Sequence, residues 1–136
     1  MKVLVDTNIV LDLLTDRLPF SKAARKIFAT AEQWKMDLFI TASSVTDIFY
    51  IVRKHTDRKK AEEILVQLLD IVKIIEVTGK DIKKALTLDF NDFEDALQAR
   101  CAKKRKLDFI ITRNKKDFAK SSIKAISPDE LLKKLA

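Results

Sequence analysis

Short apolar segments alternate with amphipathic helical segments along this chain, and this alternation limits the possible folds more than any other feature. We expect strands at residues 2–5, 38–41, 71–77, 109–112 and 125–126. Periodicity and capping residues predict helices at 9–14, 21–35, 43–55, 57–70, 78–88 and 91–106, with a last helix that begins at Pro128. Strands that each feed a helix indicate an α/β fold, in which a central parallel sheet is covered by helices on both faces.

The size of the chain suits one domain. It has 136 residues, of which 47% are hydrophobic, enough to close one core, so we expect a single domain over residues 1–136. Gly79 is the only glycine, which excludes the phosphate-binding loops that need two or three glycines. His55 and Cys101 are the only residues of their types, which excludes a zinc site with three or four such ligands and an intramolecular disulfide.

The net charge of the chain is positive. It has 27 Lys and Arg against 20 Asp and Glu, a formal charge of +7, which suits a polyanionic partner. The densest basic run, Lys103 to Lys106, fits either a phosphate backbone or the solvated C-terminal turn of a helix. We find no signal peptide and no apolar run near 18 residues, so we expect a cytoplasmic protein without a membrane partner.

Oxygen-bearing side chains follow the expected strands, where ligands of parallel α/β sheets bind. Asp6-Thr7-Asn8 follows the first strand, Thr41 and Ser43 follow the second, and Thr112-Arg113-Asn114 follows the fourth. Asp6 has two interpretations at this stage: it is a functional carboxylate or simply the N-cap of the next helix.

Further carboxylates lie on two of the expected helices. Asp47 shares a helix face with Tyr50 and Ile51 and has no Lys or Arg three or four residues away, so we expect it to be half-buried without a local partner. Asp92 and Asp95 lie three residues apart on one face of a later helix. Asp92 also suits a helix N-terminus, and Asn91 to Glu94 has the spacing of a capping box.

A shared site for Asp6, Asp47 and Asp95 would require a cation. Two carboxylates about 5 Å apart repel by roughly 3 kcal/mol at an effective dielectric constant near 20. An all-oxygen ligand set favours a hard ion, Mg²⁺ or Mn²⁺, bound largely through water. Ions held this way activate water and stabilise the attacked phosphate in hydrolytic phosphoryl transfer.

Four segments together resemble one known family. They are VLVDTNIVLDLL, ITASSVTDIFYIV, DFEDALQARCA and FIITRNKKDF, and in this order they resemble a PIN domain, most of all the VapC-type toxins of toxin–antitoxin pairs. The resemblance implies a Rossmann-like three-layer α/β/α sandwich and a Mg²⁺- or Mn²⁺-dependent endoribonuclease. It implies catalytic roles for Asp6, Asp47 and Asp95, with Asp6 and Asp95 holding the metal. The supporting residues are Thr7, Asn8, Asp92, Thr112, Asn114 and Asp117.

The chain departs from the family pattern at two places. The second acid is most often Glu, whereas this chain has the shorter Asp47. A fourth acid often follows the fourth strand, where this chain has the uncharged Asn114. Asp117 then supplies the fourth carboxylate, or the site binds a single ion weakly.

Expected partners also follow from the resemblance. We expect an RNA substrate whose backbone contacts Arg113, Lys115 and Lys116, and a small antitoxin that covers the acids. We expect a homodimer formed through helices 21–35 and 43–55, which with the strand between them carry large side chains: Phe28, Trp34, Phe39, Phe49, Tyr50 and Ile51. The alternatives are that these side chains are core residues, and that the chain is a PIN-fold binding module without activity, a DNA-directed member, or a receiver-type signalling domain.

Overall fold

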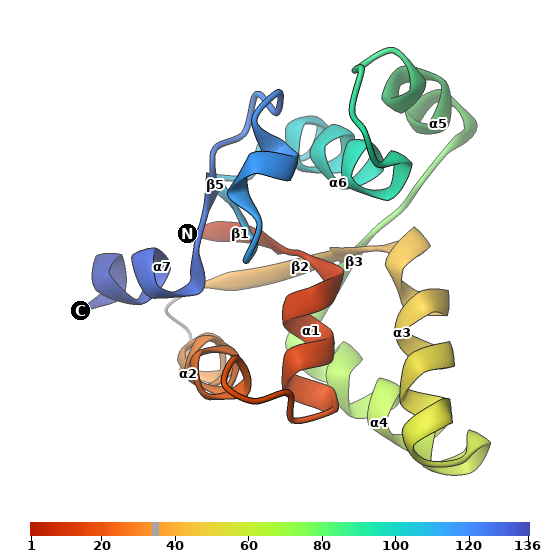
Figure 1. Ribbon diagram of the computed structural model, residues 1–136, viewed down its shortest axis with the longest axis vertical. Helices are drawn as coiled ribbons and strands as arrows, with labels where there is room; N and C mark the ends of the chain where they lie inside the picture. Colours follow the sequence, from red (N-terminus) through yellow and green to blue (C-terminus); the bar gives the residue numbers. More distant parts are fainter. Residues whose placement is uncertain (34–35) are drawn as a thin grey trace.

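A five-stranded parallel sheet organises the computed structural model, which describes residues 1–33 and 36–136. The strand order is β3 (Val72–Ile75), β2 (Asp37–Thr41), β1 (Lys2–Val5), β4 (Phe109–Ile111) and β5 (Ala125–Ile126). One face is covered by α5 (Gly79–Leu86), α6 (Phe93–Lys104) and the 3-10 helix η1 (Lys115–Phe118) (Figure 1). The other is covered by α1 (Thr7–Leu14), α2 (Ser21–Glu32), α3 (Ala42–His55) and α4 (Arg58–Ile71), and α7 (Pro128–Leu135) packs against α2. The predicted three-layer α/β/α sandwich is confirmed.

Each inner strand is buried on both faces. Val3 and Val5 of β1 contribute to the core beneath α1 to α4, whereas Leu4 between them packs with the core beneath α6. The small residues Ala99 and Ala102 are fully or almost fully buried, so α6 lies close to the sheet. This packing sets α6 directly above the carboxyl end of β1.

The element ends differ from the prediction by a few residues. Helix α1 begins at Thr7 rather than Ile9, and α4 continues to Ile71, so the third strand spans only Val72–Ile75. Helix α6 ends at Lys104 because Lys106 adopts a left-handed backbone conformation with φ of 53°. The last helix begins at Pro128 after a capping box between Ser127 and Glu130. Trp34 and Lys35 lie outside the described residues. No helix in the described part of the chain has the length and apolarity needed to cross a membrane.

A buried carboxylate ties α5 to α6. Asp81 is 1% exposed and accepts hydrogen bonds from Arg100 Nε at 3.0 Å, Lys104 Nζ at 2.6 Å and the Thr78 N–H at 2.9 Å. Burial alone would raise the pKa of Asp81, but the bonds from Lys104, Thr78 and Arg100 outweigh it and hold the pKa below its usual range. One cation of the basic run at Lys103 to Lys106 is therefore structural.

We expect Asp81→Ala to lower the free energy of unfolding by about 3 kcal/mol at neutral pH, because it leaves two cations without their partner. A depressed carboxyl pKa contributes stability above the unfolded pKa, and that contribution is lost as the pH falls through the folded pKa. The deficit should therefore shrink below about pH 4, the unfolded pKa of Asp. Urea unfolding of both proteins at about pH 7 and pH 3 measures this, and an equal deficit at both pH values would contradict it.

Candidate active site

Asp6 lies at the carboxyl end of β1, where its side chain is held from two sides. Gln98 Nε2 of α6 donates to Asp6 Oδ1 at 3.0 Å, and Thr112 Oγ1 donates to Oδ2 at 2.9 Å. The Asn114 N–H donates in turn to Thr112 Oγ1 at 3.1 Å. Asp6 is also the N-cap residue of α1, as one of its two interpretations predicted, but its side chain makes no capping hydrogen bond to the helix.

The environment of Asp6 opposes its charge. The residue is 4% exposed, and burial raises its pKa, although the hydrogen bonds from Gln98 and Thr112 act in the opposite direction. Elevated carboxyl pKa values are typical of functional sites, because a folded protein rarely keeps an unpaired acid in its interior for stability. Within the described residues, no Lys or Arg forms an ion pair with Asp6.

Glu94 belongs to this site and was missed in the sequence. We interpreted it as the end of a capping box, but that prediction is wrong: Asp92 is the N-cap of α6 and accepts the Asp95 N–H at 2.9 Å. The side chain of Glu94 instead accepts a hydrogen bond from Thr7 Oγ1 at 2.7 Å. The only sequence signal was its position beside Asp95 in the first turn of a helix.

A cavity of about 260 Å³ joins Glu94 to the second expected acid. It is lined by Asp6, Thr7, Asn8, Leu11, Asp47, Tyr50, Ile51 and Glu94. The expectation that Asp47 is half-buried is wrong, because it is exposed: it lies on the solvent side of α3, whereas Ile48 and Val52 face the core. Burial and the proximity of Asp47 raise the pKa of Glu94, against the hydrogen bond from Thr7.

Asp95 lies among other acids in a neighbouring cavity of about 370 Å³, which is also lined by Asp92, Asp117 and Lys116. Burial, together with the charges of Asp92, Asp6 and Asp117, raises the pKa of Asp95 to about 7. Asp117, on η1, therefore lies close enough to Asp95 for its charge to act on it. The charge of Asp6 therefore acts on Asp95 although the two acids line separate cavities.

The oxygen atoms present fit a hard divalent cation held mainly through water. Within residues 1–33 and 36–136, no three His, Cys, Asp or Glu side chains gather closely enough to hold one ion between them. Mg²⁺ commonly binds one or two carboxylates and keeps several waters, so a site with fewer than three acids still fits such an ion. Gln98 Oε1 adds a buried oxygen beside Asp6 that has no hydrogen-bond partner among the described residues.

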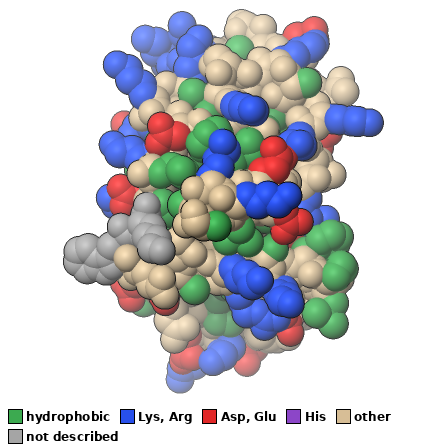
Figure 2. Space-filling model, turned by 90° about the vertical axis from the view of Figure 1, so that its left-hand side faces the viewer, with side chains coloured by type: hydrophobic (Ala, Val, Ile, Leu, Met, Phe, Trp, Pro, Cys, Tyr) green, Lys and Arg blue, Asp and Glu red, His purple; other side chains and the backbone are tan. Residues whose placement is uncertain are grey.

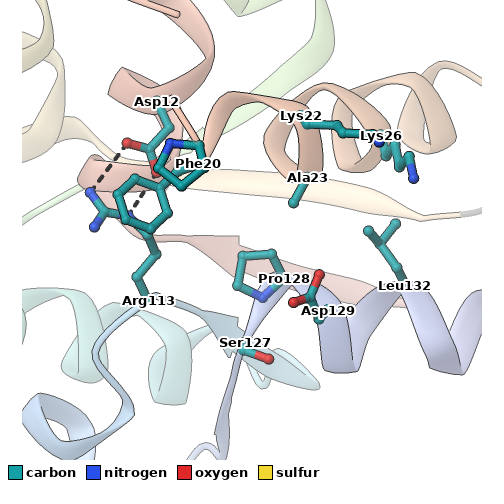
Figure 3. A pocket seen from close by; sticks show the side chains of 11 residues that line it. Asp12, Phe20, Lys22, Ala23, Lys26, Arg113, Ser127, Pro128, Asp129 and Leu132 are labelled. Carbon is teal, nitrogen blue, oxygen red and sulfur yellow. Dashed lines mark hydrogen bonds and ion pairs between the residues drawn. The ribbon is translucent and has the colours of Figure 1, made fainter. Parts of the chain in front are cut away.

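Two of the three expected RNA-binding cations are engaged elsewhere. The Arg113 guanidinium donates to Asp12 from Nε at 2.8 Å and from Nη2 at 3.2 Å, and it lies 3.9 Å from the Phe20 ring centre (Figure 3). These residues border a cavity of about 580 Å³ between α2 and the start of α7. Lys115 pairs with Glu130 at 2.7 Å. Of these three cations, Lys116 lines the cavity of Asp95, which Lys120 also lines.

Known proteins match the chain over most of its length. The family model described as PIN domain matches residues 2–116. Ribonuclease VapC1 of Aquifex aeolicus is 29% identical over 134 residues, covering 95% of this chain and 92% of the relative. Solved structures with the same fold include VapBC from Salmonella typhimurium, at TM-score 0.73 and 13% identity over 94% of this chain and 98% of that chain. The toxin–antitoxin complex from Klebsiella pneumoniae matches at TM-score 0.70 and 23% identity, over 93% and 97%. With the family model covering most of its residues and the acids placed around the ends of its strands, the chain belongs to the PIN domain family.

Proposed function

We propose that this protein is a Mg²⁺- or Mn²⁺-dependent endoribonuclease and the toxin of a toxin–antitoxin pair. The observation that carries the proposal is the pair of Asp6, at the carboxyl end of β1, and Asp95, in the first turn of α6: the pKa of each carboxyl is raised, and the charge of Asp6 contributes to the raised pKa of Asp95. The likeness to a protein named Ribonuclease VapC1 supports RNA as the substrate. The structural likeness to VapBC complexes supports the assignment as a toxin.

The acids of the site and their hydrogen-bond partners have different roles in this proposal. Asp6 and Asp95 hold the cation, which when bound supplies an activated water and stabilises the attacked phosphate. Gln98 and Thr112 orient Asp6. Glu94, held by Thr7 at Oε1, lies beside Asp47 and has a raised pKa, so the two together accept the proton that hydrolysis releases.

One lysine beside the acids is a candidate contact for the RNA backbone. We propose Lys116 as a phosphate contact because it borders the cavity of Asp95. Figure 2 shows the face that carries α7 and both chain ends, where basic side chains are scattered between acidic and apolar ones. The charge of +7 alone therefore does not select that face for RNA.

Metal binding should be visible in the stability of the protein without RNA. Millimolar Mg²⁺ or Mn²⁺ should raise the melting temperature, because a ligand that binds only the native state stabilises it. Asp95→Asn should abolish most of this shift. Differential scanning fluorimetry with and without EDTA measures it, and an unchanged melting temperature in wild type would contradict the proposed metal site.

The pH adds a second readout for Asp95. A carboxyl group whose pKa is raised in the folded state destabilises the protein as the pH rises above the unfolded pKa, which is about 4 for Asp. For Asp95 this destabilisation develops up to the folded pKa of about 7. The metal-free Asp95→Asn protein should therefore melt higher than wild type at about pH 8, with a smaller gain at about pH 4.

The proposed partners are a second copy of the chain and an antitoxin. Phe28 and Phe39 are core residues, but Tyr50 is 62% exposed beside the acids. We propose that α2 and α3 form the homodimer and that an antitoxin segment covers the cavity of Asp6 and Asp47. Light scattering at micromolar concentration tests the dimer, and a monomeric mass unchanged by dilution would reject it. The cytoplasmic location also stays a proposal.

A PIN-fold binding module with weak or no activity is the second candidate. It is favoured by Asn114 in place of a fourth acid and by the exposure of the short Asp47. Purified protein incubated with RNA or with DNA of the same sequence, each with Mn²⁺ or EDTA, separates the candidates. Mn²⁺-dependent RNA cleavage supports the nuclease, DNA cleavage alone supports the DNA-directed member, and binding without cleavage supports the module.

A further inference from the structure

Gln98 contacts the carboxylate of Asp6 from the interior of the protein. It lies on α6 one turn after Asp95 and is 0% exposed. Its Nε2 reaches Asp6 Oδ1 at 3.0 Å, while Thr112 reaches Oδ2 at 2.9 Å. Each oxygen of Asp6 therefore has one neutral donor, and the two donors come from different elements, α6 and the end of β4. A carboxylate held at both oxygens cannot rotate freely.

The other end of the Gln98 amide has no partner. Oε1 is buried without a hydrogen bond among the described residues, which is rare for buried polar atoms. While Asp6 is ionised, the amide cannot turn over to find one, because Oε1 would then face Asp6 Oδ1 and two acceptors would repel. A methionine would fill a similar volume without leaving a buried oxygen unpaired, so packing does not account for an amide at this position.

We infer that Gln98 is a positioning residue, whose Nε2 fixes the Asp6 carboxylate in the orientation that binds the divalent cation. This inference rests on the proposed function. Groups that hydrogen-bond a metal ligand orient it, and their loss typically reduces metal affinity or activity by about 10- to 100-fold. Gln98 acts through Asp6 and needs no contact with RNA.

Gln98→Met tests this because it removes the donor and keeps the side-chain length. In a Mn²⁺ titration of the melting temperature without RNA, the half-saturating concentration should rise about tenfold or more. RNA cleavage should fall at low Mn²⁺ and recover most of its kcat at saturating Mn²⁺, because the ligands themselves remain. If Gln98→Met does not fold, Gln98→Asn carries the same test, since its amide is one methylene too short to reach Asp6.

Cys101→Ala is the matched control. Cys101 is equally buried on α6 but belongs to the core beneath the helix, so its truncation should lower the metal-free melting temperature without moving the Mn²⁺ midpoint. A Mn²⁺ midpoint in Gln98→Met equal to that of wild type would overturn the inference while leaving the proposed function intact. A wild type that shows neither a Mn²⁺-dependent melting shift nor Mn²⁺-dependent cleavage would overturn both.

Discussion

Asp6→Asn and Asp95→Asn are each expected to reduce metal-dependent RNA cleavage by more than about 100-fold, the upper range for losing only a partner of a metal ligand. Each substitution removes a charge that the cation needs, and asparagine keeps the size of the side chain. Both proteins should stay folded, because burial already disfavours the charged form of each acid. Cleavage of a labelled RNA with Mn²⁺, together with circular dichroism of each variant, provides the measurement.

Asp70→Asn is the control for this experiment, since Asp70 is an exposed acid on α4. It removes the same charge from the protein and should leave cleavage unchanged. Equal cleavage by wild type and both active-site variants, or cleavage that EDTA does not inhibit, would exclude the metal-dependent nuclease.

Arg113→Ala is expected to lower the free energy of unfolding by about 3–5 kcal/mol, the typical consequence of leaving a buried charge without its partner. Asp12 is 0% exposed and receives both guanidinium bonds of Arg113. Arg17 Nη1 lies 4.0 Å from Asp12 Oδ1, at the limit of an ion pair, so it cannot replace the two hydrogen bonds from Arg113. Unfolding in guanidinium chloride measures this loss of free energy, provided that the m-value is the same in both proteins.

Two further variants test the cause. Lys115→Ala breaks the exposed pair with Glu130, so it should change stability by less than about 1 kcal/mol. Asp12→Leu combined with Arg113→Ala should be more stable than Arg113→Ala alone, because no buried charge remains unpaired. If Arg113→Ala leaves stability unchanged and weakens RNA binding, Arg113 contacts the RNA backbone as the sequence first indicated.

The sequence predicted the elements well and their ends less well. The third strand was expected over residues 71–77, but Ile71 belongs to α4 and only Val72–Ile75 pairs with β2. An apolar run such as IVKIIEV satisfies a helix end and a strand equally, and periodicity does not separate them. The 3-10 helix η1 was missed because four residues are too few to show a period.

The sequence by itself determined the α/β architecture and the positions of Asp6 and Asp95, since strand and helix periodicity is local and marks which residues follow a strand or share a helix face. Only the tertiary structure decided their partners. Thr7 and Glu94 are 87 residues apart, Asp6 and Gln98 are 92 apart, and Asp12 and Arg113 are 101 apart. Hydrogen bonds form only within about 3 Å and in favourable directions. Which distant side chains meet at that range is therefore set by how α1, α6 and β4 pack, and no local pattern encodes it.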